Sequence, residues 1–88
     1  MALLDRVFVG TVIRDFGIIN ETSMGIGKQR VSLLLAERGG HKKLVFKTSS
    51  WAILGGSVSY VEVPADAIPK LRQWIDEAMD LIASGQMR

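Results

Sequence analysis

The single histidine of the chain lies in a short basic segment, "AERGGHKKLVFK", whose side chains suit three kinds of chemistry: metal binding, acid–base catalysis and contact with phosphate. A metal site would need further ligands, and the sequence offers no second His, no Cys and no acid pair at ligand spacing. Acid–base catalysis by His41 lacks a neighbouring nucleophile or orienting group. Phosphate contact fits best, because Arg38, His41, Lys42, Lys43 and Lys47 are concentrated in one predicted hairpin.

Two further patterns are weak as catalytic motifs. The segment "GIGK" differs from a Walker loop, because Thr22 stands where that loop needs Gly, and Gln29 stands where it needs Ser or Thr. We interpret it as a mobile basic loop in which Lys28 and Arg30 close over a strand of nucleic acid, the alternative being a flexible connection. The carboxylates of the C-terminal segment have no catalytic companion. The sequence therefore predicts that the chain is not an enzyme and uses no metal or other cofactor.

Composition indicates one small globular domain over residues 1–88. Hydrophobic residues make up 48% and charged residues 23% of the chain, and a chain of 88 residues buries a modest core unless a partner completes it. No Cys is present, no apolar run is long enough to cross a bilayer, and the N-terminus lacks the basic region of a signal peptide. We therefore expect a cytoplasmic protein that forms a homo-oligomer and has no membrane partner.

The net charge of +2 is unevenly distributed. The half containing residues 1–50 is basic and the half containing residues 51–88 is acidic. This asymmetry predicts either one positive face or two ordinary solvated faces.

The pattern of apolar residues predicts an α+β fold with four antiparallel strands, one C-terminal helix and two layers. Gly39-Gly40 forms a tight hairpin turn, and residues 15–29 form a long loop. The helix is capped by Asp66, tolerates Pro69 in its first turn and stops at Gly85. The strands are expected over residues 6–14, 28–38, 42–48 and 57–63.

Alternation along the strands divides their side chains between two faces. One face is predicted to lie under the helix and form the core; its members are Val7, Val9, Ile13, Val31, Leu33, Leu35, Leu44, Phe46, Val61 and Val63. The opposite face mixes apolar, aromatic and basic groups; its members are Phe8, Val12, Arg14, Arg30, Ser32, Leu34, Arg38, Lys43, Val45, Lys47, Val58, Tyr60 and Glu62. Such a mixture suits either a dimer contact or a platform for nucleic acid.

The segment "SVSYVEVPADAIPKLRQWIDEAMDLI" at residues 57–82 resembles the final strand and helix of Pur-alpha-type repeats, a plan similar to that of Whirly proteins and related transcription coactivators. The resemblance covers about the last third of the chain. It implies binding of single-stranded nucleic acid on a curved sheet and pairing of copies through their helices or sheets. It assigns no functional residue, because the matching stretch is structural.

These observations predict a homodimer that binds single-stranded DNA or RNA with little sequence preference. The alternative is a protein-interaction or assembly module in which Leu34, Val45 and Val58 contact a partner. A third hypothesis is a small-ligand pocket near Trp51. The residues predicted to bind nucleic acid are Phe8, Arg14, Lys28, Arg30, Arg38, Lys42, Lys43, Lys47 and Tyr60.

Overall fold

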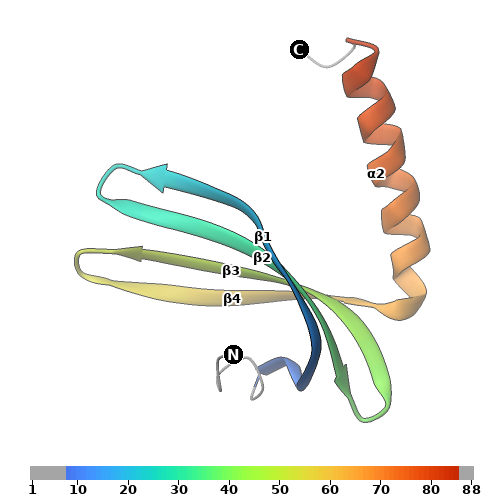
Figure 1. Cartoon of the computed structure of the whole chain (residues 1–88), viewed down its shortest axis with the longest axis horizontal. Coiled ribbons are helices and arrows are strands. Elements are labelled where there is room, and N and C mark those ends of the chain that lie inside the picture. Colours follow the sequence, from blue (N-terminus) through green and yellow to red (C-terminus); the bar gives the residue numbers. More distant parts are fainter. Residues whose placement is uncertain (1–7, 86–88) are drawn as a thin grey trace.

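The computed structural model of the chain describes residues 8–85 (Figure 1). Four strands pair antiparallel in the order in which they follow one another along the chain. They are followed by a short 3₁₀ turn, η1 (Ala65–Ala67), and by one helix, α2 (Ile68–Ala83). The strands are β1 (Thr11–Met24), β2 (Gly27–Arg38), β3 (His41–Ala52) and β4 (Gly55–Pro64). The predicted α+β fold, a four-stranded antiparallel sheet followed by one C-terminal helix, is confirmed.

The prediction of a long loop over residues 15–29 is wrong, because most of that segment belongs to β1. The strand continues through its polar residues to Met24, which pairs with Gly27 across a two-residue turn. Gly25 occupies the first position of the turn with φ +60°, a conformation that suits glycine and closes a tight hairpin. The backbone pairing with β2 therefore outweighs the low strand propensity of Asn, Glu, Thr and Ser.

Three register shifts interrupt the pairing of β1 with β2, and each adds one residue to β1. They fall between Val12 and Arg14, between Asp15 and Gly17, and between Ile18 and Asn20. An extra residue bends a strand and increases its twist. The sheet is accordingly curved, with residues 8–10 inside the bend and α2 outside it (Figure 1). We call these two sides the concave face and the convex face.

The other predicted strands and the Gly39-Gly40 turn are present, but the bounds of the strands differ from the predicted ones. Gly39 and Gly40 form the β2–β3 turn with φ +59° and +81°, as predicted. Strands β3 and β4 extend to Ala52 and Gly55 and close a third hairpin, where the sequence suggested an irregular segment. Asp66 lies in η1 and makes no side-chain cap, so the predicted cap is wrong.

The core lies on the concave face, where Val9 packs on the sheet. Val9, Leu34, Ala36 and Val45 are buried together, with Val12 and Tyr60 packed against them. The sequence predicted Val9 on the other face and Leu34 and Val45 on an uncovered one. Both predictions are wrong, because Val9 precedes β1 and folds over the sheet on the side that carries Leu34 and Val45.

Helix α2 does not cover the face that was predicted to lie beneath it. None of its residues is buried, and its principal packing among the described elements is with the adjacent η1. The predicted core residues on the convex face remain partly exposed, Val61 by 60%. Val7 lies outside the described residues. The chain is therefore flat and open, with extents of 42 × 41 × 15 Å. Among the described residues, no helix has the length and hydrophobicity that a membrane span requires.

Candidate nucleic-acid interface

The concave face gathers most of the predicted binding residues. Every second residue of a strand points to the same side, and residues paired across strands share a face. Lys28 pairs with Trp51, Arg30 with Ser49, and Lys47 with both Ser32 and Tyr60, so these side chains form one surface. The predicted residues that share the concave face with Phe8 are Lys28, Arg30, Arg38, Lys43, Lys47 and Tyr60.

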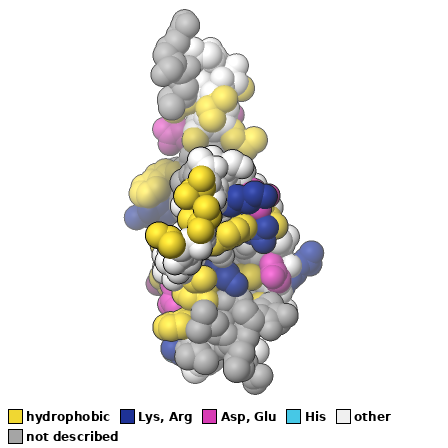
Figure 2. Space-filling view, turned by 90° about the vertical axis from the view of Figure 1, so that its left-hand side faces the viewer, with side chains coloured by type: hydrophobic (Ala, Val, Ile, Leu, Met, Phe, Trp, Pro, Cys, Tyr) yellow, Lys and Arg dark blue, Asp and Glu magenta, His cyan; other side chains and the backbone are white. Residues whose placement is uncertain are grey.

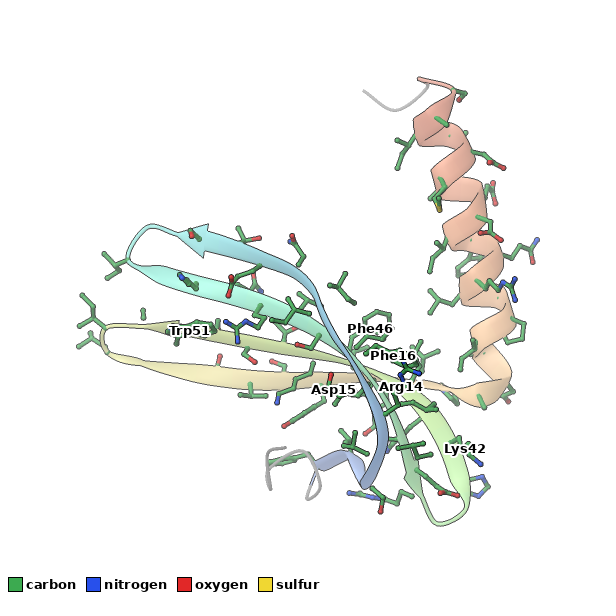
Figure 3. The ribbon with its side chains drawn as sticks, in the orientation of Figure 1. Arg14, Asp15, Phe16, Lys42, Phe46 and Trp51 are labelled. Carbon is green, nitrogen blue, oxygen red and sulfur yellow. The ribbon has the colours of Figure 1, made fainter. Side chains whose placement is uncertain are left out.

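Arg14 and Lys42 lie on the convex face instead. Lys42 pairs with Glu37 and Arg14 with Leu35, and both partners belong to the convex row of β2. The face predicted for Arg14 is wrong, because the extra residue between Val12 and Arg14 reverses the alternation of β1. Figure 3 shows Arg14 with Phe16 and Phe46 on the side of the sheet toward α2.

Arg30 is held between an acid and an aromatic ring. Its guanidinium donates two hydrogen bonds to Glu21 Oε2, at 2.7 Å from Nη2 and 3.0 Å from Nε. Its Cζ also lies 5.1 Å from the centre of the Trp51 ring. The hydrogen bond and the charge of Arg30 lower the pKa of Glu21 below its ordinary value. The guanidinium thus lies over the Trp51 ring with its charge partly balanced by Glu21.

Lys43 is also paired, but in a more enclosed place. Its Nζ lies 3.0 Å from Glu62 Oε1, and its side chain is 14% exposed. Reversing this charge would place two carboxylates together in a partly buried site, which destabilises the fold. Neutral substitutions on the concave face, such as Lys28→Gln and Lys47→Gln, therefore test the role of charge better than a charge reversal at Lys43.

Two aromatic groups are exposed at different places along the concave face. The rings of Phe8 and Tyr60 stack with their centroids 5.7 Å apart, so Phe8 covers one side of Tyr60 while remaining half exposed. Trp51 lies farther along β3 and is 39% exposed. Phe8 and Trp51 both line a hollow of about 520 Å³ whose other walls include Ser49, Gly56 and Val58.

Trp51 was absent from the predicted binding residues. The sequence prediction ended the third strand at residue 48, so the alternation was not carried far enough. Continuing it from Lys47 through Ser49 places Trp51 on the same face, and this is the signal that could have identified it.

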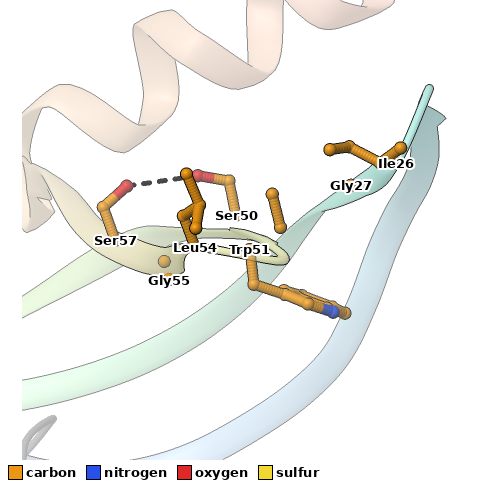
Figure 4. Close-up of a pocket in the computed structure, with 9 residues that line it drawn as sticks. Ile26, Gly27, Ser50, Trp51, Leu54, Gly55 and Ser57 are labelled. Atoms are coloured by element: carbon orange, nitrogen blue, oxygen red, sulfur yellow. Dashed lines mark hydrogen bonds between the residues drawn. The ribbon is translucent and has the colours of Figure 1, made fainter.

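A second hollow, of about 560 Å³, lies at the tips of the β1–β2 and β3–β4 hairpins (Figure 4). Its described lining includes Ile26, Trp51 and Leu54, and its polar side chains are Ser50 and Ser57, whose hydroxyls lie 3.1 Å apart. Hydrophobic side chains gather at this end of the molecule, with Lys or Arg side chains beside them (Figure 2). The hollow has no charged lining residue to orient a small ligand, so the third hypothesis gains no support.

His41 begins β3 directly after the Gly39-Gly40 turn and pairs with Arg38. Gly40, His41 and Lys42 border a further hollow with Pro64 and Asp66. Across residues 8–85, no group of three or more His, Cys, Asp or Glu side chains is placed to hold a metal ion. The hairpin therefore places positive charge at one end of the sheet.

Comparisons of the chain with protein-family models, with curated proteins and with solved structures find no match. The geometry of the two sheet faces is therefore the basis for inferring function.

Proposed function

We propose that the chain binds single-stranded DNA or RNA on its concave face, with little sequence preference, and acts as a homodimer. The observation that carries the proposal is the combination of exposed rings and cations on one curved surface. Phe8 and Trp51 border a shared hollow, and Lys28, Arg30 and Lys47 lie on the same face. Bases stack on aromatic rings, and Lys and Arg attract the phosphates between them.

The type of contact explains why sequence preference should be small. Stacking uses the flat surface that every base has, and phosphate contacts carry no sequence information. Trp51 with the guanidinium of Arg30 beside it is suited to stacking. A single strand fits this surface better than a duplex, because bases within a duplex already stack on one another.

The homodimer is supported by apolar surface that the single chain leaves uncovered. The rival function, a protein-assembly module, was assigned to Leu34, Val45 and Val58. Leu34 and Val45 are 1% and 0% exposed, so they are core residues and cannot contact a partner. Apolar surface for assembly is instead found on the convex face and on α2, which leaves the concave face available for nucleic acid.

The decisive experiment measures binding of a labelled mixed-sequence single strand by fluorescence anisotropy over a range of salt concentrations. Affinity should fall steeply as salt rises, because bound phosphates release their counterions. Replacing both Lys28 and Lys47 with Gln should reduce the slope of log K against log salt by about 1.4 if each side chain contacts one phosphate. Lys70→Gln with Arg72→Gln, which removes the same charge from α2, is the matched control.

Three results would contradict binding of a single strand on the concave face. Absence of binding at low salt, or equal effects of the sheet variant and the helix variant, would show that the concave face does not hold the strand. Tighter binding to a duplex than to the single strand would contradict the role given to Phe8 and Trp51.

The Glu21–Arg30 pair yields a separate prediction. Glu21→Gln removes a negative charge from the concave face and frees the charge of Arg30 to attract phosphate, so affinity for the single strand should rise about 2- to 5-fold, the range of one exposed ion pair. The same anisotropy measurement gives the result. Glu77→Gln on α2 is the control and should leave affinity unchanged; an unchanged or weakened affinity for Glu21→Gln would mean that Arg30 makes no phosphate contact.

A further inference from the structure

Helix α2 carries an apolar stripe that the described chain leaves largely exposed. Ile68, Leu71, Ile75, Met79 and Ile82 recur at three- and four-residue steps and so lie on one side of the helix. Met79 and Ile82 are 62% and 64% exposed. An isolated helix of 16 residues is marginally stable in water, so this helix needs a packing partner.

The convex face of the sheet also needs a packing partner. Leu33, Leu35, Leu44 and Phe46 line its centre, but no second layer among residues 8–85 covers them. Phe16 is half exposed beside the guanidinium of Arg14, whose Cζ lies 4.9 Å from the ring centre. A continuous apolar sheet face without a cover is typical of an interaction surface.

The connection between β4 and α2 directs the helix away from its own sheet. Pro64 has an extended backbone, with φ −64° and ψ 156°, and is followed at once by the rigid turn η1 and then by Pro69. No flexible linker lies between strand and helix. The helix leaves the end of the sheet on the convex side and extends beyond it (Figure 1). It is therefore placed to reach another molecule.

The amount of exposed surface indicates how large the missing contact is. The accessible surface of the chain is 6661 Å², whereas a compact monomer of 9.7 kDa exposes about 5,100 Å². The radius of gyration is 15.4 Å, compared with about 12 Å for a compact domain of this length. Covering the excess of about 1,500 Å² on each of two chains would bury about 3,000 Å² in total, a size usual for obligate homodimers.

We infer that the missing cover is α2 of a second copy: in the homodimer proposed above, each α2 lies across the convex face of the other chain. In a dimer with two-fold symmetry, α2 of the first chain contacts the convex face of the second, and α2 of the second contacts the convex face of the first. One arrangement therefore covers both helices and both sheets. Helix-to-helix pairing alone would leave the sheets open, and sheet-to-sheet pairing alone would leave the helices open.

Met79→Glu tests this arrangement. Met and Glu have similar helix propensities, so the change adds a charge to the apolar stripe without weakening the helix itself. Light scattering should give about twice 9.7 kDa for the unmodified chain and a shift toward 9.7 kDa for the variant. Gln73→Glu, which adds the same charge on the opposite side of α2, should remain a dimer.

Cysteine cross-linking identifies the two surfaces directly, because the chain has no Cys of its own. A tagged chain carrying Met79→Cys is mixed with untagged chains carrying Leu33→Cys, Phe46→Cys or Val61→Cys in separate reactions, and each mixture is oxidised. A disulfide between tagged and untagged chains is expected for at least one pair. Leu54→Cys, at the hairpin tip, is the control and should not cross-link.

Several outcomes would overturn the inference. They are a monomeric unmodified chain, a dimer that resists Met79→Glu, or the absence of a disulfide between tagged and untagged chains for every pair. In one chain that carries both Met79→Cys and Val61→Cys, an intramolecular disulfide would mean that α2 folds back on its own sheet. Because these results concern mass and cross-links, they are distinct from loss of nucleic-acid binding. A monomer that still binds a single strand would leave the concave-face proposal standing.

Discussion

Leu34→Ala is expected to lower the free energy of unfolding by about 2–5 kcal/mol, the usual cost of removing a buried Leu side chain. Leu34 is 1% exposed and belongs to a core cluster of only four buried residues among residues 8–85. A cavity there reaches Val9, Ala36 and Val45 at once. Small domains have a total stability of about 5–15 kcal/mol, so this one change removes a large share of it.

Urea unfolding followed by circular dichroism measures the effect, at one fixed protein concentration because dimers gain stability with concentration. Leu54→Ala provides the matched control: Leu54 is 99% exposed at the β3–β4 turn and should change stability by less than about 0.5 kcal/mol. Similar losses for the two variants would mean that the core is not on the concave face. A large loss for Leu33→Ala with little for Leu34→Ala would restore the core that alternation alone predicted.

The type and order of the elements follow from local features of the sequence. Gly39-Gly40 determines a tight turn, and the spacing of Ile68, Ile75 and Ile82 determines a helix. The extent of β1 does not follow in the same way, since its second half is polar and its strand conformation depends on pairing with β2. Local propensity favours a loop there, and the ladder of backbone hydrogen bonds to a distant segment reverses that preference.

The division of residues between the two faces was predictable where the strands are regular. Arg30, Lys43 and Lys47 were correctly grouped with Tyr60 because β2, β3 and β4 pair without register shifts. Arg14 was misplaced because a bulge leaves no reliable mark in a single sequence. The position of α2 could not be predicted from the sequence either. An apolar helix and an apolar sheet face predict that each will be covered, but they do not show whether the cover comes from the same chain or from a second one.

Trp51→Ala should weaken binding of a single strand by about 5- to 150-fold, which corresponds to the loss of one base stack at about 1–3 kcal/mol. The ring is partly exposed on the concave face, has Arg30 beside it, and borders the hollow that it shares with Phe8. Trp51→Phe retains a smaller ring and should lose less. Anisotropy at constant salt measures all three proteins, and thermal melting checks that they are folded.

Fluorescence separates stacking from attraction between charges. The chain has two tryptophans, so Trp74→Phe leaves Trp51 as the single reporter. An oligonucleotide should quench that signal because its bases reach the ring, whereas a sulfated polysaccharide, which has charge but no bases, should bind the same face without comparable quenching. Equal quenching by both polymers, or unchanged affinity of Trp51→Ala, would show that the strand is held by its phosphates alone and that Trp51 belongs to the hydrophobic hairpin tips instead.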